Sequence, residues 1–221
     1  FQRFIMNQHR GGVEFDVMLS ADAHPVLIHD ETLERTTDGQ GNVADTPLDV
    51  LATLDAGSWL DSAFKGEFLP GLGAAARICR ELGLWANVEI KPSRGTGELT
   101  GRVAATAASD AWGDAPLPPL LSSFDTAALL QARIAAPHLQ RALLFDAVPA
   151  DWREQLDKLD CIALHCNAGK LNKRRARDIL DAGCGLAVWT VNDPTRARLL
   201  FDWGVNAIFT DRLDLIPPDF V

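Results

Sequence analysis

Residues 186–210, LAVWTVNDPTRARLLFDWGVNAIFT, contain a complete strand–helix–strand unit. The apolar runs Leu186–Val191 and Ala207–Thr210 have the length and composition of buried strands. Between them, Asp193-Pro194 supplies an expected N-cap and a proline at the first helical position. Gly204 stands where a left-handed residue should end that helix. Because the strands are continuously apolar, the unit predicts parallel strands that are covered by helices.

The same unit is repeated along most of the chain. The other expected strands are Phe4–Gln8, Val13–Leu19, Val26–His29, Trp85–Lys91, Leu120–Phe124, Arg141–Phe145 and Cys161–His165, and the expected helices are Leu72–Leu82, Glu98–Trp112, Thr126–Ala136, Trp152–Leu159, Lys173–Ala182 and Thr195–Trp203. About eight parallel strands in an α/β chain predict a (β/α)8 TIM barrel, formed by residues 1–221 as a single domain. A doubly wound open sheet is the alternative. No G-x-G-x-x-G follows a strand, so the dinucleotide-binding form of that alternative is unsupported.

Residues 31–70 interrupt this pattern. They are rich in Thr, Asp and Gly and show no clear period. About 40 residues are too many for an ordinary loop. We therefore interpret them as a small insertion after the second strand, at the mouth of the site, with the region of Trp59 and Leu60 packing locally.

The connection between the first two strands is too short for a parallel pair, because only Gly11 and Gly12 separate them. A parallel crossover needs a dozen residues or more. One solution is an antiparallel hairpin turned on the two glycines, which would place His9 opposite Glu14. The other is a gap between Gly12 and Val13. We favour the gap, because every later connection forms a βα unit, so that the first crossover helix is missing from the chain.

Composition and charge exclude several classes of function. The net charge of −9 argues against non-specific nucleic-acid binding, and a phosphate-bearing substrate would need local cations. No apolar run reaches the roughly 18–20 residues that span a bilayer, so membrane insertion is not expected. The four cysteines form no C-x-x-C pair and are typical of reduced thiols in a cytoplasmic protein. The oligomeric state is not set by these features.

Two short phrases alternate polar and apolar residues at the spacing of a strand. Glu14 and Asp16 therefore project from one face, and so do the polar residues of Asn87–Lys91. Carboxylates side by side on an apolar strand are costly unless something neutralises them, and Mg²⁺ and Ca²⁺ prefer such oxygens. His9 and His29 lie at the ends of neighbouring apolar runs. The sequence thus predicts a metal site flanked by two imidazoles.

An ordered set of phrases resembles the glycerophosphodiester phosphodiesterase family over nearly the whole chain. The matching phrases are His9-Arg10-Gly11, Glu14-Phe15-Asp16, His29-Asp30 with Leu33-Glu34-Arg35-Thr36, Glu89-Ile90-Lys91-Pro92, Ser122-Ser123-Phe124, Trp189-Thr190-Val191-Asn192 and Thr210-Asp211. The phrase Asp55-Ala56-Gly57-Ser58-Trp59 is especially similar to the cytosolic bacterial members. One departure is large: the family's Pro-Glu-Asn-Thr phrase and first helix, which follow His-Arg-Gly, are absent here.

The resemblance implies a TIM barrel with its site at the carboxyl ends of the strands. The implied roles are one divalent cation, Mg²⁺ or Ca²⁺, on Glu14, Asp16 and Glu89, an acid–base pair of His9 and His29, and phosphate binding by Arg10 and Lys91. Trp189 is either a core residue or a wall for the glycerol moiety of the substrate. The implied reaction hydrolyses small glycerophosphodiesters, such as glycerophosphocholine or glycerophosphoethanolamine, to glycerol 3-phosphate and an alcohol.

Other interpretations of the same residues stay open. Glu14 and Asp16 could face solvent on an edge strand, and Lys91 could simply pair with Glu89. A relative that cleaves a lysophospholipid headgroup would need an apolar channel for the acyl chain. A non-catalytic barrel is the alternative if the segment after Gly12 is truly deleted.

Overall fold

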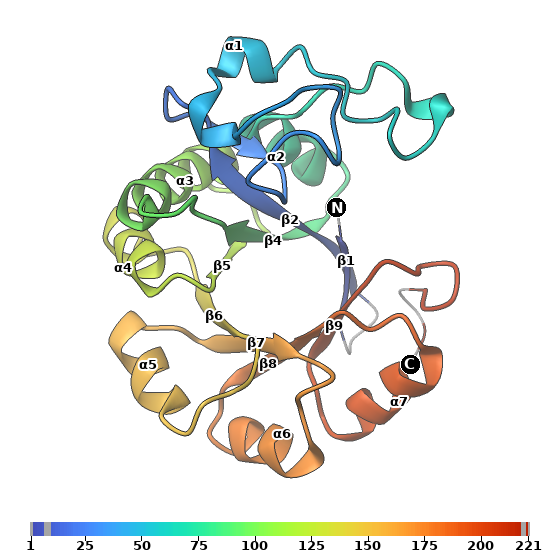
Figure 1. Ribbon diagram of the computed structural model, residues 1–221. Helices are drawn as coiled ribbons and strands as arrows, with labels where there is room; N and C mark the ends of the chain where they lie inside the picture. The colour runs from blue at the N-terminus through green and yellow to red at the C-terminus, as the bar shows by residue number, and fades with distance from the viewer. Residues whose placement is uncertain (1, 7–9, 218–219, 221) are drawn as a thin grey trace.

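One curled sheet forms the centre of the molecule (Figure 1). The computed structural model describes residues 2–6, 10–217 and 220, and for residues 2–6 and 10 the backbone alone. Its strands are β1 (Gln2–Met6), β2 (Arg10–Leu19), β3 (Pro25–Leu27), β4 (Trp85–Ile90), β5 (Leu120–Ser123), β6 (Arg141–Phe145), β7 (Ala163–Asn167), β8 (Gly185–Trp189) and β9 (Ala207–Thr210). Their order is β1-β9-β8-β7-β6-β5-β4-β2-β3, and β1 also pairs with β2, so the sheet closes on itself.

Helices cover the outside of this barrel (Figure 1). They are α1 (Leu48–Leu51), α2 (Leu72–Glu81), α3 (Gly97–Trp112), α4 (Thr126–Ala135), α5 (Trp152–Leu159), α6 (Lys173–Leu180) and α7 (Pro194–Asp202). From β4 to β9 every strand is parallel to the next and is joined to it by one helix, as the repeated sequence unit predicts. The expected cap of α7 is confirmed, because the Asp193 side chain accepts a hydrogen bond from the Thr195 amide. Gly204 has a φ of 93°, which favours glycine.

The first strand departs from the expected topology. β1 is antiparallel to both β2 and β9, so the described sheet has seven parallel strands in its barrel rather than about eight. The connection from Met6 to Arg10 is too short for a parallel crossover, and a hairpin is the geometry that remains. No helix lies between β1 and β2 in the described part of the chain, and the absence of a first crossover helix stays a prediction.

The antiparallel hairpin, one of the two solutions expected for this connection, is found between β1 and β2. Gly12 and Val13 are consecutive residues of β2, paired with Trp85 and Ala86 of β4, so the expected gap between them is not found. The hairpin differs from the expected one in its turn, since Gly11 and Gly12 both lie within β2 and Glu14 pairs with Gln2. Gly12 has a packing role instead. A Cβ atom there would lie 2.7 Å from the carbonyl oxygen of Trp85.

Alternate residues of each barrel strand point to opposite faces, one packed against the helices and one inside the barrel. Residues that face outward, such as Leu143, Leu164 and Ile208, are buried against the surrounding helices. The inward faces carry small apolar residues, among them Ala142, Ala163 and Ala187. Small side chains leave space inside the barrel for the larger polar residues that the inward faces also carry.

Residues 31–70 pack on one side of the barrel above β2 and β3 (Figure 1). Leu33, Val43 and Leu51 are buried there with Met18 of β2. Trp59 is half exposed, and its indole Nε1 donates to the carbonyl oxygen of Ala56 at 2.9 Å. That these residues are an insertion into the barrel stays a prediction.

Two expectations from composition concern cysteines and membranes. All four cysteines are free thiols. Burial raises the pKa of the Cys166 thiol to about 12, which makes a reactive thiolate unfavourable. Within the described ranges of the chain, we find no helix with the length and apolar character needed to cross a bilayer.

Candidate active site

Three carboxylates converge at the carboxyl end of the barrel strands. Glu14 and Asp16 are two residues apart on β2, and Glu89 on β4 is the register partner of Asp16. Each offers an oxygen within 4.8 Å of those of the other two. Lys91 Nζ lies 3.2 Å from Asp16 Oδ1 and adds one positive charge. The alternation in the sequence therefore brings four of the predicted site residues together.

This cluster carries more negative charge than its surroundings neutralise. Burial, followed by repulsion from Asp16 and Glu89, raises the pKa of Glu14 well above its ordinary value. Burial and repulsion from Asp16 raise the pKa of Glu89 to about 8. Lys91 opposes both shifts without cancelling them. A hard divalent cation would relieve this repulsion, so the donor set fits Mg²⁺ or Ca²⁺.

Buried hydrogen bonds hold the strand that carries Glu89. Asn87 Nδ2 donates to Ser122 Oγ at 2.9 Å, which ties the inward face of β4 to β5. Ser123 Oγ donates to the carbonyl oxygen of Ile90 at 2.5 Å. Both serines are fully buried. These bonds fix the end of β4 on either side of Glu89, and such support holds metal-binding carboxylates in place.

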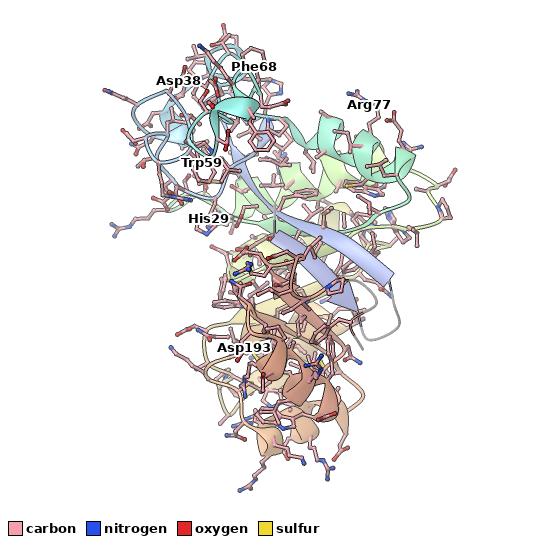
Figure 2. The ribbon with its side chains drawn as sticks, turned by 90° about the vertical axis from the view of Figure 1, so that its right-hand side faces the viewer. His29, Asp38, Trp59, Phe68, Arg77 and Asp193 are labelled. Carbon is pink, nitrogen blue, oxygen red and sulfur yellow. The ribbon has the colours of Figure 1, made fainter. Side chains whose placement is uncertain are left out.

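His29 follows β3 and is oriented by a charged neighbour. Its Nδ1 lies 2.6 Å from Asp30 Oδ1, while the Arg35 guanidinium binds the same carboxylate through Nε and Nη2. Arg35, followed by His29, holds the pKa of Asp30 far below its usual range. The bond at Nδ1 leaves His29 Nε2 as the nitrogen available for proton transfer. Figure 2 shows His29 and Asp193 toward one end of the barrel and Arg77 toward the other.

Trp189 ends β8 and packs partly inside the barrel with Ala187 and Phe209. Its ring meets that of Phe124, the residue after β5, with centroids 5.7 Å apart and planes at 79°. The ring thus packs against the interior and meets Phe124 at the barrel rim, and its contact with the substrate stays a prediction. Phe124 belongs to a phrase quoted above, but its position at the rim was not predicted.

His165 on β7 is a polar interior residue to which the sequence assigns no task. It is buried, and its ring contacts Phe209 with centroids 5.2 Å apart. Burial lowers the pKa of His165 to about 3, so the imidazole is uncharged near pH 7. Its inward orientation follows from strand alternation, because Ala163, two residues earlier, also faces the interior.

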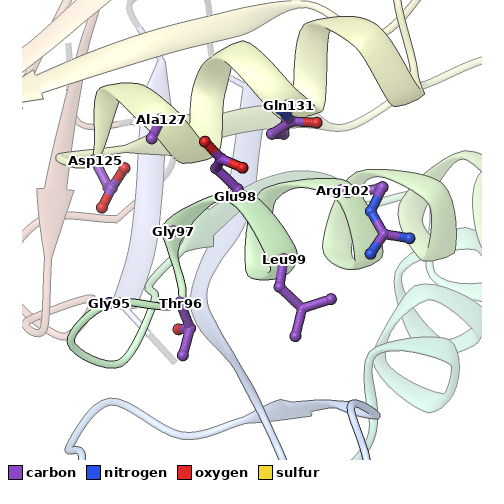
Figure 3. A pocket seen from close by; sticks show the side chains of 9 residues that line it. All are labelled: Gly95, Thr96, Gly97, Glu98, Leu99, Arg102, Asp125, Ala127 and Gln131. Carbon is purple, nitrogen blue, oxygen red and sulfur yellow. The ribbon is translucent and has the colours of Figure 1, made fainter.

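Two predicted residues cannot be placed beside this cluster. His9 lies outside the described residues, and Arg10 is described by its backbone in β2 alone. A separate cavity of about 540 Å³ lies where α3 and α4 begin (Figure 3). Its lining includes Arg102 and Asp125 and none of the predicted site residues.

Comparison with known proteins agrees with this arrangement. The sequence pattern of the family described as "Glycerophosphoryl diester phosphodiesterase family" matches residues 5–215. The chain belongs to this family. A glycerophosphodiester phosphodiesterase of Caldanaerobacter subterraneus subsp. tengcongensis is 30% identical over 201 residues, which are 90% of this chain and 82% of that protein. A second one, from Bacillus subtilis, is 28% identical and covers 92% of this chain and 74% of its own length.

Solved structures of the family share the fold. A phosphodiesterase of Oleispira antarctica, solved with the product sn-glycerol-3-phosphate, superimposes with a TM-score of 0.85 at 37% identity. The match covers 90% of this chain and 81% of that one. A glycerophosphodiester phosphodiesterase of Agrobacterium tumefaciens superimposes with a TM-score of 0.72 at 25% identity, over 91% of this chain and 84% of that one. The chain is thus an enzyme of this family, built on the same barrel.

Proposed function

We propose that this enzyme hydrolyses small glycerophosphodiesters to glycerol 3-phosphate and an alcohol, with the help of one divalent cation. Glycerophosphocholine and glycerophosphoethanolamine are representative substrates, and we expect the enzyme to act on them in the cytoplasm. The observation that carries the proposal is the convergence of Glu14, Asp16 and Glu89, each with an oxygen within 4.8 Å of the others, beside Lys91.

The three carboxylates would hold the cation. Their pKa directions support this role, because burial and then repulsion between the carboxylates raise the pKa of Glu14 and of Glu89, and a divalent charge offsets both effects. When bound, the cation offsets charge on the non-bridging phosphate oxygens. Hard carboxylate oxygens suit both Mg²⁺ and Ca²⁺.

The chain's own groups position the phosphate and move protons. Lys91 Nζ gives the phosphate a point charge, and Arg10 is assigned to the same group by the family resemblance. His29 Nε2 transfers a proton at an ester oxygen, while Asp30 fixes the ring through Nδ1. His9 is assigned to the complementary proton transfer by the family resemblance. Trp189 would form a wall at the rim beside the substrate.

A product assay tests this proposal. The purified protein is treated with chelator and dialysed, then incubated with glycerophosphocholine with or without Mg²⁺ or Ca²⁺, and glycerol 3-phosphate is measured enzymatically. We expect product with the cation and a loss of at least about a hundredfold without it. Product that persists undiminished in excess chelator would overturn the metal-dependent mechanism. No product under any condition would favour a non-catalytic barrel.

A second substrate class has one structural observation in its favour. The segment 55–68 exposes four large apolar side chains, Trp59, Leu60, Phe64 and Phe68. The Arg35 guanidinium lies over the Trp59 ring and pairs with Asp30, so it connects this segment to the neighbour of His29. Such a surface could accommodate the acyl chain of a lysophospholipid. The assay therefore includes lysophosphatidylcholine below its micelle concentration. Faster release of choline from it than from glycerophosphocholine would favour this class.

A further inference from the structure

Residues 170–177, KLNKRRAR, form a basic stretch in a protein whose net charge is −9. The stretch holds five of the 21 basic residues and no carboxylate. It contains the first five residues of α6, and Lys170, Lys173, Arg174 and Arg177 are exposed. Among the described residues we find no ion pair of the Lys173, Arg174 or Arg177 side chain. Their charges are therefore available to a partner.

The stability of α6 does not explain these charges. Lys173, Arg174 and Arg175 occupy its first turn, which has no acidic residue. The partial positive charge at the start of a helix makes cations unfavourable there and carboxylates favourable. Asn172 supplies the cap, since its Oδ1 accepts from the Arg175 amide at 2.9 Å, and this bond needs no basic neighbour. A surface charge cluster that opposes helix stability is instead evidence of a role in binding.

The acidic charge of the molecule is concentrated on the opposite side of the barrel. Residues 31–70 hold eight carboxylates and two basic residues. They lie above β2 and β3, whereas α6 packs against β8 across the barrel (Figure 1). In about 0.1 M salt the screening length is about 10 Å. An anionic surface in contact with α6 is therefore attracted by the basic stretch, while its repulsion by the distant carboxylates is screened.

The chemistry of the proposed substrate favours a lipid surface over other polyanions. A glycerophosphodiester is a glycerophospholipid that has lost both acyl chains, so the reaction that supplies it is carboxylic ester hydrolysis at a lipid surface. Residues 170–177 contain no aromatic side chain on which a nucleic-acid base could stack. The stretch also follows the carboxyl end of β7, and the cluster of Glu14, Asp16 and Glu89 lies at the same end of the barrel.

We propose that the basic stretch 170–177 docks this enzyme reversibly on bilayers that contain anionic phospholipid. The contact is peripheral, because the ammonium and guanidinium groups meet lipid phosphates at the bilayer surface. Only the choice of lipid as the partner rests on the proposed function. Each basic residue close to an anionic bilayer strengthens binding by about fivefold, so several together give binding that a vesicle assay detects. The screening length falls to about 3 Å in 1 M salt, where the binding should be lost.

Vesicle sedimentation of the full chain, in chelator, tests the proposal. The vesicles contain about 30% phosphatidylglycerol in phosphatidylcholine, or phosphatidylcholine alone. We expect the wild type to bind only the anionic vesicles, and only in the lower salt. Combining Arg174→Gln with Arg177→Gln should weaken binding by more than about tenfold, whereas Arg174→Lys with Arg177→Lys should keep it. Arg77→Gln with Arg102→Gln is the control, because it removes two exposed charges from α2 and α3.

Three results would overturn the inference. The first is no binding of the wild type to anionic vesicles in about 0.1 M salt. The second is equal binding by the variant that combines Arg174→Gln with Arg177→Gln, provided that its melting temperature is unchanged. The third is tighter binding to a single-stranded oligonucleotide or to an oligoglutamate peptide, at an equal concentration of charged groups, which would assign the stretch to nucleic acid or to an acidic protein.

Hydrolysis of soluble glycerophosphocholine, with divalent cation added, separates this inference from the proposed function. The variant that combines Arg174→Gln with Arg177→Gln should hydrolyse it as the wild type does, because these residues lie outside the carboxylate cluster. Vesicle binding without any diester hydrolysis would remove the proposed function and leave the docking surface in place.

Discussion

Lys91 Nζ lies 3.2 Å from Asp16 Oδ1, although 75 residues of sequence separate them. Asp16 pairs in register with Glu89 on the adjacent strand, and Lys91 is two residues beyond Glu89. Lys91 therefore acts on the whole carboxylate cluster, and its charge opposes part of the rise in the pKa of Glu14 and Glu89. In the proposed function the same ammonium group turns to the phosphate of the substrate.

Replacing Lys91 with Met should have two opposite effects. The loss of a cation beside the phosphate should lower kcat/KM for glycerophosphocholine by about a hundredfold. Removal of the positive charge that competes with the metal should tighten divalent cation binding, by roughly tenfold. Calorimetric titration and steady-state kinetics measure the two effects. Lys158→Met, which breaks an exposed pair with Glu154, serves as the control. Weaker cation binding in Lys91→Met would contradict this account.

Asp30→Asn should lower kcat more than it changes KM. The substitution removes the charge that orients His29 through Nδ1 and releases Arg35 from the same carboxylate. We expect kcat to fall by about ten- to a hundredfold, because an imidazole that is poorly oriented transfers a proton less efficiently. Asp49→Asn, an exposed carboxylate on α1, controls for the change of charge. An unaltered kcat would contradict the claim that Asp30 orients His29 for proton transfer.

The stability of the metal-free protein should fall as pH rises from about 6.5 to about 8. Glu89 has a folded-state pKa of about 8, above its ordinary value of 4.5, and the pKa of Glu14 is raised as well. Between those values each of these carboxyls binds its proton more firmly in the folded state than in the unfolded state, so its contribution to the free energy of unfolding decreases as pH increases. Above about pH 6.5 the opposite contribution of His165 has been lost. Cation binding needs the ionised carboxylates, and its stabilising effect should grow over the same range.

Thermal unfolding at several pH values, in chelator and in Mg²⁺ or Ca²⁺, measures this effect. Glu89→Gln should flatten the slope seen in chelator, because the variant has lost one of the titrating groups. If the melting temperature of the wild type in chelator rises with pH over this range, the raised pKa values of Glu14 and Glu89 are contradicted.

His165 should make the protein sensitive to acid. Its folded-state pKa is about 3, below the ordinary 6.5, so between these values the unfolded state binds the extra proton and stability falls as pH falls. One proton contributes a slope of about 1.4 kcal/mol per pH unit. His165→Asn should reduce the slope of unfolding free energy against pH by about that amount. His138→Asn, at an exposed position, should leave it unchanged, and equal slopes in wild type and His165→Asn would contradict the neutral buried imidazole.

The sequence predicted the helix ends and the faces of the strands, because these features depend on residues only a few positions apart. Asp193 and Gly204 limit α7 as expected, because caps and left-handed residues act over a few positions. Strand alternation placed Glu14 and Asp16 on one face, and the family resemblance added Glu89 to them. The topology of β1 was missed, since pairing between strands depends on the whole sheet. Sequence spacing cannot show that Gly12 is needed for the close approach of Trp85.

The contacts at the site that the sequence did not predict share a physical cause. The contact between the Phe124 and Trp189 rings joins the ends of two strands that are not neighbours in the sheet order. No local period encodes such a contact. The Asn87–Ser122 bond likewise joins two strands, 35 residues apart in sequence. Long-range contacts of this kind follow from how far each strand is shifted relative to the next, which the apolar pattern alone does not specify.

The central claim is that Glu14, Asp16 and Glu89 together hold one divalent cation needed for diester hydrolysis. The most direct measurement is calorimetric titration of chelator-stripped wild type and Glu89→Gln with Mg²⁺ and Ca²⁺, paired with glycerol 3-phosphate release from the same samples. Glu81→Gln, an exposed residue at the end of α2, is the matched control. We predict one cation per wild-type and Glu81→Gln chain, and for Glu89→Gln a loss of both binding and product. Full cation-dependent product release by Glu89→Gln would contradict the account.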